Sequence, residues 1–448
     1  MYLDGMTYFR DVVEAIGAAR YNIMIADWCM SPRIYLRRES GAIQTFRLDL
    51  LLQRKARQGI QVFVLLYKDI AIGLGSDFTE DYLQKLHANI HVVRHNCLKC
   101  TAPDYLEKIY YSHHQKCVVV DNSAAFVGGI DLCYGRFETP DYNIKDIDGK
   151  WFPGHSYKNP QMELEGGDPK SHLREPFLTA MQINRHHHWR MPWNDVHSCV
   201  TGQAAADVAL MLVQRWQTHN HTNGTAPAMV PVWPGLLLRN WDIQGCWQTG
   251  SVQLLRSMAC WSGNEMVETS IYRCYLEMIR TAKHSIYIEN QFFISAIEGN
   301  NTVHNRICQA LFDRIMLAIT KNEKFRVIVV VPFHADGPLH SEMAMSVLHY
   351  LRASVAFTPT SLLQSLAREA GKIKDRAVNL EDYIVFLSLG QWGEMTYEHE
   401  DKGFSAGANK SQKFGKQPVF TQVQLKQLFD YIVFEPSRVL RMVQMFPF

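Results

Sequence analysis

The sequence predicts an α/β fold made of two similar α/β halves, with mixed sheets flanked by helices. Two observations support this. Segments with apolar residues at helical spacing alternate with short apolar runs typical of buried strands. The order of these segments then returns later in the chain, and an internal repeat of this kind indicates a duplicated structural unit. The length of 448 residues allows two core-sized units.

The first half begins with an amphipathic helix. Met6, Phe9, Val13 and Ile16 recur every three or four residues, so they share one face of a helix. Later apolar runs between turn residues indicate strands, and Gly59 stands where glycine often ends a helix. The predicted elements are a helix over 6–20, a strand over 21–28, a helix over 46–58, a strand over 61–67, a short helix over 82–87 and a strand over 90–93.

The second half repeats this order. The segment from Ala19 resembles the segment from Ala282 in the character of each residue, which is an offset of 263 residues. The next strand, from Gln61, returns at Arg326 with an offset of 265. After an insertion, the strand at Ile90 returns at Tyr383. The predicted elements are a helix over 271–282, a strand over 282–291, a helix over 305–319 and strands over 326–333 and 383–389.

These elements divide the chain into four parts. We expect a first half over residues 1–140, a segment of loops covering the site over 141–250, a second half over 251–389 and a divergent C-terminal segment over 390–448. The intervening segment contains one predicted helix, 204–216, and the apolar run Trp189–Asp195. Composition leaves two roles open for this run: it packs as core, or it forms a lipid-facing rim.

Composition narrows the class of protein. Hydrophobic residues make up 47% and charged residues 20%, as in soluble globular proteins. The net charge of +2 disfavours a nucleic-acid binder that depends on bulk charge. The start lacks the pattern of a signal peptide, and no apolar run approaches the roughly 18 residues of a membrane span, so we expect a cytoplasmic protein whose membrane contact is peripheral. The ten cysteines are then expected to be reduced thiols.

Two sequence features suggest a metal site, and neither is sufficient. Cys97 and Cys100 form a lone C-x-x-C without a second pair at zinc-binding spacing. The three consecutive histidines from His186 would point in alternating directions on an extended segment, and a polar loop explains them more simply. We expect no metal ion in the functional site.

The run from Tyr111 to Asp121 contains the pattern H-x-K-x4-D, formed by His114, Lys116 and Asp121. Residues two apart in a strand share a face, so the imidazole and the ammonium lie side by side. Such a pair suits attack on a phosphodiester, because the imidazole can be nucleophile or acid and the ammonium can hold phosphate oxygens. Asp121 could orient an imidazole. The competing interpretation is an ordinary buried strand that starts with a surface histidine.

The chain resembles the phospholipase D superfamily, and within it the eukaryotic phospholipases D that hydrolyse phosphatidylcholine. The H-x-K-x4-D run with its trailing segment Ala125–Arg136 is similar to the first catalytic motif of that family. The segments Trp189–Asp195, Gly202–Val208, Gln214–Trp216 and Ser285–Ser295 are similar to further parts of its catalytic core. The resemblance covers about residues 2–389.

The resemblance implies two α/β halves related by a pseudo-two-fold axis, with one metal-free active site at their interface. It implies a phosphohistidine mechanism with two histidines, in which His114 is the nucleophile and Lys116 clamps the phosphate. Asp121 and Asp131 would orient imidazoles. The backbone at Gly128 and Gly129 would approach the phosphate, although a tight turn explains these glycines as well. Asn290 and Gln291 would face the site, or else be ordinary polar residues at a strand end.

The second half lacks its own catalytic motif. By the repeat offset, a second H-x-K-x4-D should begin near residue 407, yet the chain contains no other H-x-K. Either this loss is real, or a wrong final exon has replaced the motif. A dimer that joins two copies of His114 is disfavoured, because the second half already fills the partner's place.

Two functions therefore stay open. The first is phospholipase D activity, which hydrolyses phosphatidylcholine to phosphatidic acid and choline. The second is a weakly active or inactive homologue that binds phospholipid surfaces or a partner protein. A phosphodiesterase acting on nucleic acid is disfavoured by the near-neutral charge. We expect no cofactor, apart from the phosphoinositide activation that the resemblance suggests, and a phospholipid substrate at a membrane surface. The oligomeric state is left open.

Overall fold

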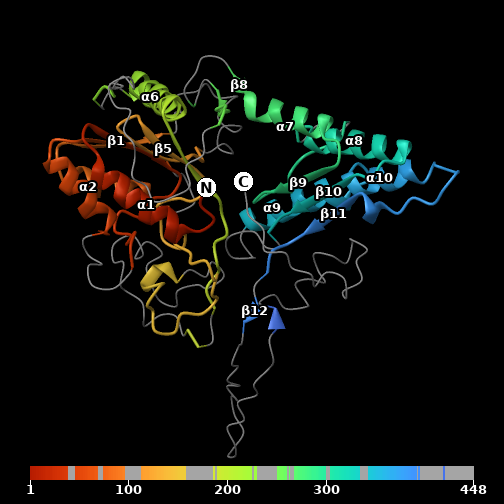
Figure 1. Ribbon diagram of the computed structural model, residues 1–448, viewed down its shortest axis with the longest axis horizontal. Helices are drawn as coiled ribbons and strands as arrows, with labels where there is room; N and C mark the ends of the chain where they lie inside the picture. The colour runs from red at the N-terminus through yellow and green to blue at the C-terminus, as the bar shows by residue number, and fades with distance from the viewer. Residues whose placement is uncertain are drawn as a thin grey trace, which may run out of the picture. The chain divides into compact units, whose positions relative to one another are not determined.

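The computed structural model describes residues 1–38, 46–68, 74–95, 113–157, 185–186, 189–223, 227–229, 250–259, 262, 267–298, 303–332, 342–390, 392–393 and 417–418 (Figure 1). The described residues form two compact units, unit 1 up to Thr269 and unit 2 from Ser270 onward. Each unit has a sheet and a core of its own. The pseudo-two-fold relation between the halves and a site at their interface stay predictions.

Unit 1 is built on a mixed sheet. Its six strands lie in the order β3-β2-β1-β4-β5-β6, in which the first three run parallel and the last three antiparallel. The strand β1 therefore joins the parallel part to the catalytic-motif strand β4. The strands are β1 (Asn22–Asp27), β2 (Gln61–Tyr67), β3 (Ile90–His95), β4 (Lys116–Val120), β5 (Ala124–Gly128) and β6 (His197–Thr201).

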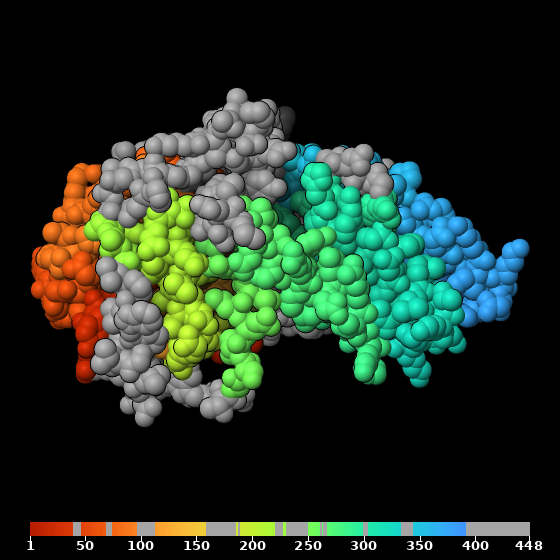
Figure 2. Space-filling view, turned by 90° about the horizontal axis from the view of Figure 1, so that it is seen from above, coloured from red at the N-terminus to blue at the C-terminus, as the bar shows by residue number. Residues whose placement is uncertain are grey.

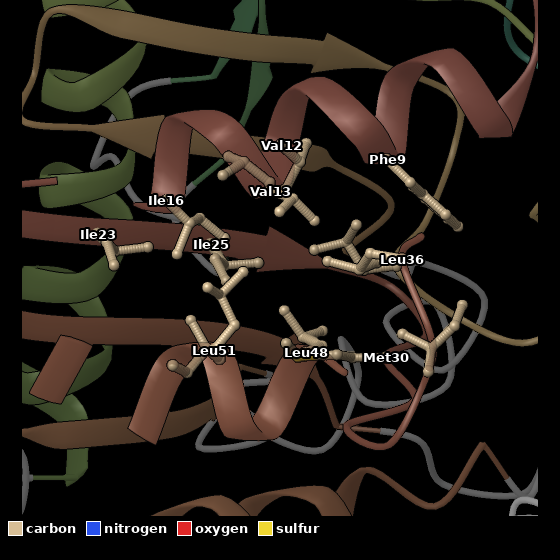
Figure 3. Packing of buried hydrophobic residues seen from close by; sticks show 14 of the residues in the cluster. Phe9, Val12, Val13, Ile16, Ile23, Ile25, Met30, Leu36, Leu48 and Leu51 are labelled. Atoms are coloured by element: carbon tan, nitrogen blue, oxygen red, sulfur yellow. The ribbon is translucent and has the colours of Figure 1, made fainter. Parts of the chain in front are cut away.

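Helices cover both faces of this sheet. Alternate residues of β1 point to opposite sides: Ile23 and Ile25 pack with α1 and α2 (Figure 3), whereas Met24 and Ala26 pack with α6. Burial on both faces explains why the parallel strands are nearly continuous apolar runs. The helices of unit 1 are α1 (Gly5–Ala18), α2 (Leu48–Arg57), α3 (Ser76–Gln84) and α6 (Gln203–Asn223), with a 3-10 turn at Gly154–Ser156. The outer side of α6 is visible in Figure 2.

Unit 2 contains a parallel sheet of three strands. Their order, β11-β10-β9, places the strands in the same relation as β3-β2-β1 of unit 1. In unit 1, Val62 of β2 pairs with Ile90 of β3, and in unit 2 Val327 of β10 pairs with Ile384 of β11. The elements are β9 (Ser285–Glu289), β10 (Arg326–Val330) and β11 (Ile384–Leu387), with α7 (Ser270–Thr281), α8 (Ile307–Lys321), α9 (Glu342–Arg352), a π-helical turn (Ala353–Phe357), α10 (Leu362–Ala370) and a 3-10 turn (Leu380–Asp382).

Two short strand pairs complete the described structure. They are β7 (Ser257–Met258) with β8 (Glu268–Thr269), and β12 (Trp392–Gly393) with β13 (Gln417–Pro418). Within the part of the chain that the structure describes, none of the helices combines the length and apolar character needed to cross a membrane. Most of the segment predicted as divergent, 390–448, lies outside the described residues, as do Cys97 and Cys100.

The predicted α/β fold is confirmed, and the mixed sheet lies in unit 1. The helix predicted over 82–87 lies earlier, at Ser76–Gln84, because Gly75 in a left-handed conformation starts it (φ +71°). The described part of the intervening segment belongs to unit 1, where β6 extends the sheet and α6 covers one face. The run Trp189–Asp195 is partly buried, and Arg190 within it is fully buried.

Candidate active site

The H-x-K-x4-D run is centred on the start of β4. Val118 and Val120 point into the core beneath α1 and α2, while Cys117 and Val119 point toward α6. Lys116 follows the same alternation as Val118, and Lys116 and His114 both lie beside Trp28 at the end of β1. The His114 ring is 5.2 Å from the Trp28 ring, and the Lys116 Nζ is 5.5 Å from it. The structure therefore brings the imidazole and the ammonium together.

The Lys116 ammonium is buried, and its polar partners accept only part of its three protons. Its Nζ lies 3.4 Å from Oδ1 of Asp131 and donates to the carbonyl oxygen of His114 at 3.2 Å. The side chain is only 4% exposed. An ammonium has three protons, so one proton has no acceptor among the described residues. That proton is available to a phosphate oxygen.

Asp131 helps to fix the position of Lys116. Its carboxylate accepts from the backbone N–H of Trp28 at 3.1 Å and of Cys29 at 3.2 Å. Burial tends to raise its pKa, but the charges of Lys116 and Arg136 hold the pKa below its usual range. The polar contacts of Asp131 in this structure are with Lys116, Arg136 and the end of β1, and its role in orienting an imidazole stays a prediction.

Asp27, the last residue of β1, shares a proton with Asp131. Burial and the neighbouring Asp131 charge raise the pKa of Asp27 well above its usual range, so Asp27 is the protonated member of the pair. It donates to the Asp131 carboxylate, while its own Oδ2 accepts from the N–H of Leu132 at 2.9 Å. The carboxyl pair carries one negative charge, which matches the single charge of Lys116.

His114 is the histidine of the motif that can act on a substrate. Its side chain is exposed, whereas the preceding His113 is buried and belongs to the face of β4 toward α6. Partial enclosure and the Lys116 ammonium lower the pKa of His114 to about 4, although Asp131 opposes this shift. Since the ring retains access to solvent, it is a neutral, reachable imidazole at neutral pH. This is the form that a nucleophile requires.

Asp121 lies at the other end of β4, on the order of 20 Å along the chain from His114. Its carboxylate accepts from the backbone N–H of Arg20 (2.9 Å), Tyr21 (2.8 Å) and Asn22 (3.1 Å). Asp121 thus holds the turn that leads into β1. A role of Asp121 in orienting an imidazole of this site stays a prediction.

Gly128 and Gly129 make room for the segment that precedes β6. A Cβ on Gly128 would lie 2.5 Å from the Cα of His197, and a Cβ on Gly129 would lie 1.9 Å from Oδ1 of Asp195. Neither glycine has a positive φ, so close approach and not backbone conformation requires them. The contact they permit in this structure is with Asp195 and His197. Close approach of their backbone to a phosphate stays a prediction.

Three residues that were not singled out from the sequence also surround Lys116. Arg136 lies 3.9 Å from Oδ2 of Asp131 and stacks its guanidinium 3.3 Å from the ring centre of Trp193. The Asp195 carboxylate accepts from the N–H of Val196 at 2.8 Å and from Nε1 of Trp193 at 3.1 Å. Burial raises the pKa of Asp195 to about 6. In the sequence, Trp193 and Asp195 lie at the end of the run Trp189–Asp195, and Arg136 ends the segment Ala125–Arg136.

Asn290 and Gln291 follow β9 in unit 2. The backbone N–H of Asn290 donates to the carbonyl of Val330 at 3.1 Å, and its side chain lines a small pocket with Tyr275 and Phe293. Gln291 is exposed. Their participation in the same site as His114 stays a prediction. Among the described residues, no group of histidines, cysteines and carboxylates has the arrangement of a metal site.

Comparison with known proteins identifies the relatives of this chain. A model of the family described as Phospholipase D matches residues 15–417. Phospholipase D A of Dictyostelium discoideum is 36% identical over 391 residues, covering 87% of this chain and 28% of the relative. Phospholipase D1 of Saccharomyces cerevisiae is 34% identical, covering 87% of this chain and 23% of the relative. Phospholipase D2 of Bos taurus is 32% identical, covering 88% of this chain and 44% of the relative.

The chain belongs to the phospholipase D family. It spans roughly a quarter to less than half of the length of these curated relatives. Among solved structures, phosphatidylserine synthase of Haemophilus influenzae aligns with a TM-score of 0.40 and 12% identity, over 88% of this chain and 76% of that one.

Proposed function

We propose that this chain is a phospholipase D-type phosphodiesterase that hydrolyses phosphatidylcholine to phosphatidic acid and choline. The observation that supports it best is the pairing of a neutral, exposed His114 with a buried Lys116 that retains one unshared proton. The nitrogen of His114 bonds to phosphorus as the bond from phosphorus to the choline oxygen breaks, while Lys116 holds a non-bridging oxygen. The choline oxygen takes a proton and choline leaves. Attack by water on the phosphohistidine then releases phosphatidic acid.

The substrate lies in a membrane surface, so the protein acts as a peripheral membrane protein of the cytoplasm. The near-neutral net charge of +2 supports a lipid substrate over a nucleic acid. The family resemblance adds phosphoinositides as candidate activators. No resident cofactor is required for the steps that His114 and Lys116 perform.

A second candidate function rests on the absence of another H-x-K in the sequence. A site with one of two cooperating histidines removed loses several orders of magnitude in rate. The alternative is therefore a weakly active or inactive homologue that binds phospholipid surfaces or a partner. This alternative function also includes contact with phospholipid, but it involves no phosphohistidine intermediate.

Choline release from a short-chain phosphatidylcholine separates these functions. We expect release by the wild-type chain and a loss of at least about a thousandfold in His114→Ala, because the nucleophile is gone. Lys116→Ala should lose about a hundredfold or more. His349→Ala, an exposed histidine on α9, is the matched control and should leave the rate unchanged. Equal release by wild type and His114→Ala would contradict the proposed enzyme.

A further inference from the structure

Two cysteines lie within two residues of side chains that contact Lys116. Cys29 follows Trp28 just past the end of β1, and Cys133 comes two residues after Asp131. The Lys116 Nζ is 5.5 Å from the Trp28 ring and 3.4 Å from the Asp131 carboxylate. A change in the covalent state of the two cysteines therefore reaches the Lys116 ammonium through these neighbours.

Hydrogen bonds hold the two cysteine-bearing segments against each other. Ser31, two residues after Cys29, bonds to both neighbours of Cys133. Its N–H donates to the carbonyl of Leu132 at 3.0 Å, and its Oγ accepts from the N–H of Tyr134 at 3.1 Å. The N–H of Cys29 itself donates at 3.2 Å to the carboxylate that lies two residues before Cys133. The backbones that carry the two thiols are therefore joined on both sides.

The two thiols also contact each other. A side-chain hydrogen bond with Cys29 is the largest influence on the pKa of Cys133 and, together with burial, raises that pKa well above its usual range. Cys133 is therefore a protonated thiol. Both cysteines are free of disulfides in this structure. Only a small movement separates such a pair from the sulfur–sulfur distance of about 2 Å in a disulfide.

The two thiols differ in their access to solvent. Cys29 is half-buried, so a small oxidant can reach its sulfur, whereas Cys133 is only 2% exposed. An accessible cysteine beside a second cysteine is the arrangement of redox-sensitive thiols, in which the second thiol resolves the oxidised first one. Cys117 and Cys308 are instead buried, and burial raises the pKa of each to about 12, as in unreactive structural thiols.

We propose that Cys29 and Cys133 form a reversible disulfide when the protein meets hydrogen peroxide, and that this disulfide slows the reaction at the candidate site. The Cys29 sulfur bonds to one peroxide oxygen as the O–O bond breaks, which gives a sulfenic acid, and the other oxygen leaves as water with the thiol proton. The Cys133 sulfur then bonds to the Cys29 sulfur as the S–O bond breaks, and the departing hydroxide takes the Cys133 proton to form water. The two thiols lose two electrons, which peroxide gains.

The effect on the rate rests on the proposed function, whereas the disulfide itself does not. Closing the sulfur–sulfur bond draws Cys29 toward Cys133, and the adjoining backbone at Trp28 and Asp131 moves with them. These two residues contact Lys116. A misplacement of about 1 Å in a group that positions the substrate can cost about a hundredfold in rate. We therefore expect choline release to be at least about tenfold slower in the oxidised protein.

The test follows the bond and the rate in the same sample. The full chain is reduced with dithiothreitol, desalted and treated with hydrogen peroxide, and free thiols are then blocked before peptide mass spectrometry. We expect a peptide pair joined through Cys29 and Cys133, and slower choline release from a short-chain phosphatidylcholine. Dithiothreitol should reverse both changes. Cys29→Ser should form no linked peptide, and peroxide should leave its rate equal to its own rate in dithiothreitol.

Two further variants serve as controls. Cys133→Ala lacks the second thiol, so the sulfenic acid of Cys29 should persist and react with dimedone. Cys274→Ser, at a half-buried position on α7, should form the bond and slow down as the wild type does. Absence of the linked peptide in the oxidised wild type overturns the pair, and a linked peptide with an unchanged rate overturns its effect on the site. If the reduced chain releases no choline, the proposed function fails, while the presence or absence of the linked peptide still supports or overturns the pair.

Discussion

Lys116 shows how one residue serves both the fold and the chemistry. A buried ammonium is costly unless it is paired, and the Asp131 carboxylate at 3.4 Å supplies that pairing. The Asp27–Asp131 pair shares one proton, so the cluster with Lys116 is close to neutral. The third proton of the ammonium is left for the substrate. The ammonium is thus held in place before a phosphate arrives, which is the condition for electrostatic catalysis.

The pKa of Asp195 predicts a pH-dependent effect on stability. Its pKa in the folded state, about 6, is higher than in the unfolded chain, so its contribution is fully present below about pH 4 and is lost as the pH rises through 6. Asp195→Asn cannot ionise. Relative to wild type, this variant should therefore gain about 1–2 kcal/mol of unfolding free energy between pH 4.5 and pH 7.5.

Urea unfolding at the two pH values measures this difference. Asp207→Asn, at an exposed position on α6, provides the control and should show no change with pH. A constant difference between Asp195→Asn and wild type at both pH values would contradict the raised pKa.

Gly129 offers a second test at the scale of a residue. An added Cβ would meet Oδ1 of Asp195 at 1.9 Å, so Gly129→Ala must displace the carboxyl group. By urea unfolding we expect a loss of about 1–3 kcal/mol in unfolding free energy. Gly17→Ala, on an exposed part of α1 with no atom within 4 Å, should instead stabilise the protein by about 0.5 kcal/mol. An unchanged unfolding free energy in Gly129→Ala would contradict the close approach of Asp195 to Gly129.

At the scale of secondary-structure elements, the junction of β1 and β4 depends on Asp121. Asp121 has a left-handed backbone conformation (φ +52°). Its carboxylate accepts hydrogen bonds from three backbone N–H groups and so connects the end of β4 to the turn before β1. Asp121→Ala removes these acceptors and places alanine at a positive φ. We expect a loss of about 2–4 kcal/mol in unfolding free energy.

Measurements of choline release can distinguish this structural role of Asp121 from a catalytic one. If Asp121 acts only through the fold, choline release per folded molecule and its pH profile should stay unchanged in Asp121→Ala at a temperature where the variant is folded. A shifted pH profile would instead support the imidazole-orienting role that the motif suggested.

The strands and their contacts differ in how clearly the sequence predicts them. The strands β1 and β2 are buried on both faces, so their apolar runs are plain in the sequence. The pairing of His114 with Lys116 follows from strand alternation alone. The contact of Gly129 with Asp195 depends on the register of β5 against β6, and these strands are separated by a long segment of chain. The backbone partners of Asp121, residues 20–22, could not be predicted from the sequence, because they come near only after β1 and β4 pair.

At the scale of the whole molecule, the two units share one arrangement of parallel strands but differ in what they add to it. Unit 1 extends its sheet with β4, β5 and β6, and these three strands carry the candidate site. In the described part of unit 2 the sheet stops at β9, β10 and β11. The sequence lacks a second H-x-K in the same half.

The separate cores predict how the molecule unfolds. Leu311 on α8 is fully buried in the core of unit 2, and Phe126 on β5 is fully buried in the core of unit 1. By calorimetry we expect two transitions, because each unit has its own hydrophobic core. Leu311→Ala should cost about 2–5 kcal/mol and lower only one transition, while Phe126→Ala should cost about 3–5 kcal/mol and lower only the other. Leu317→Ala, at a position on α8 that is 44% exposed, should move neither. If either core variant lowers both transitions together, the two units unfold as one, and the stability of the candidate site then depends on unit 2 even though unit 1 supplies its residues.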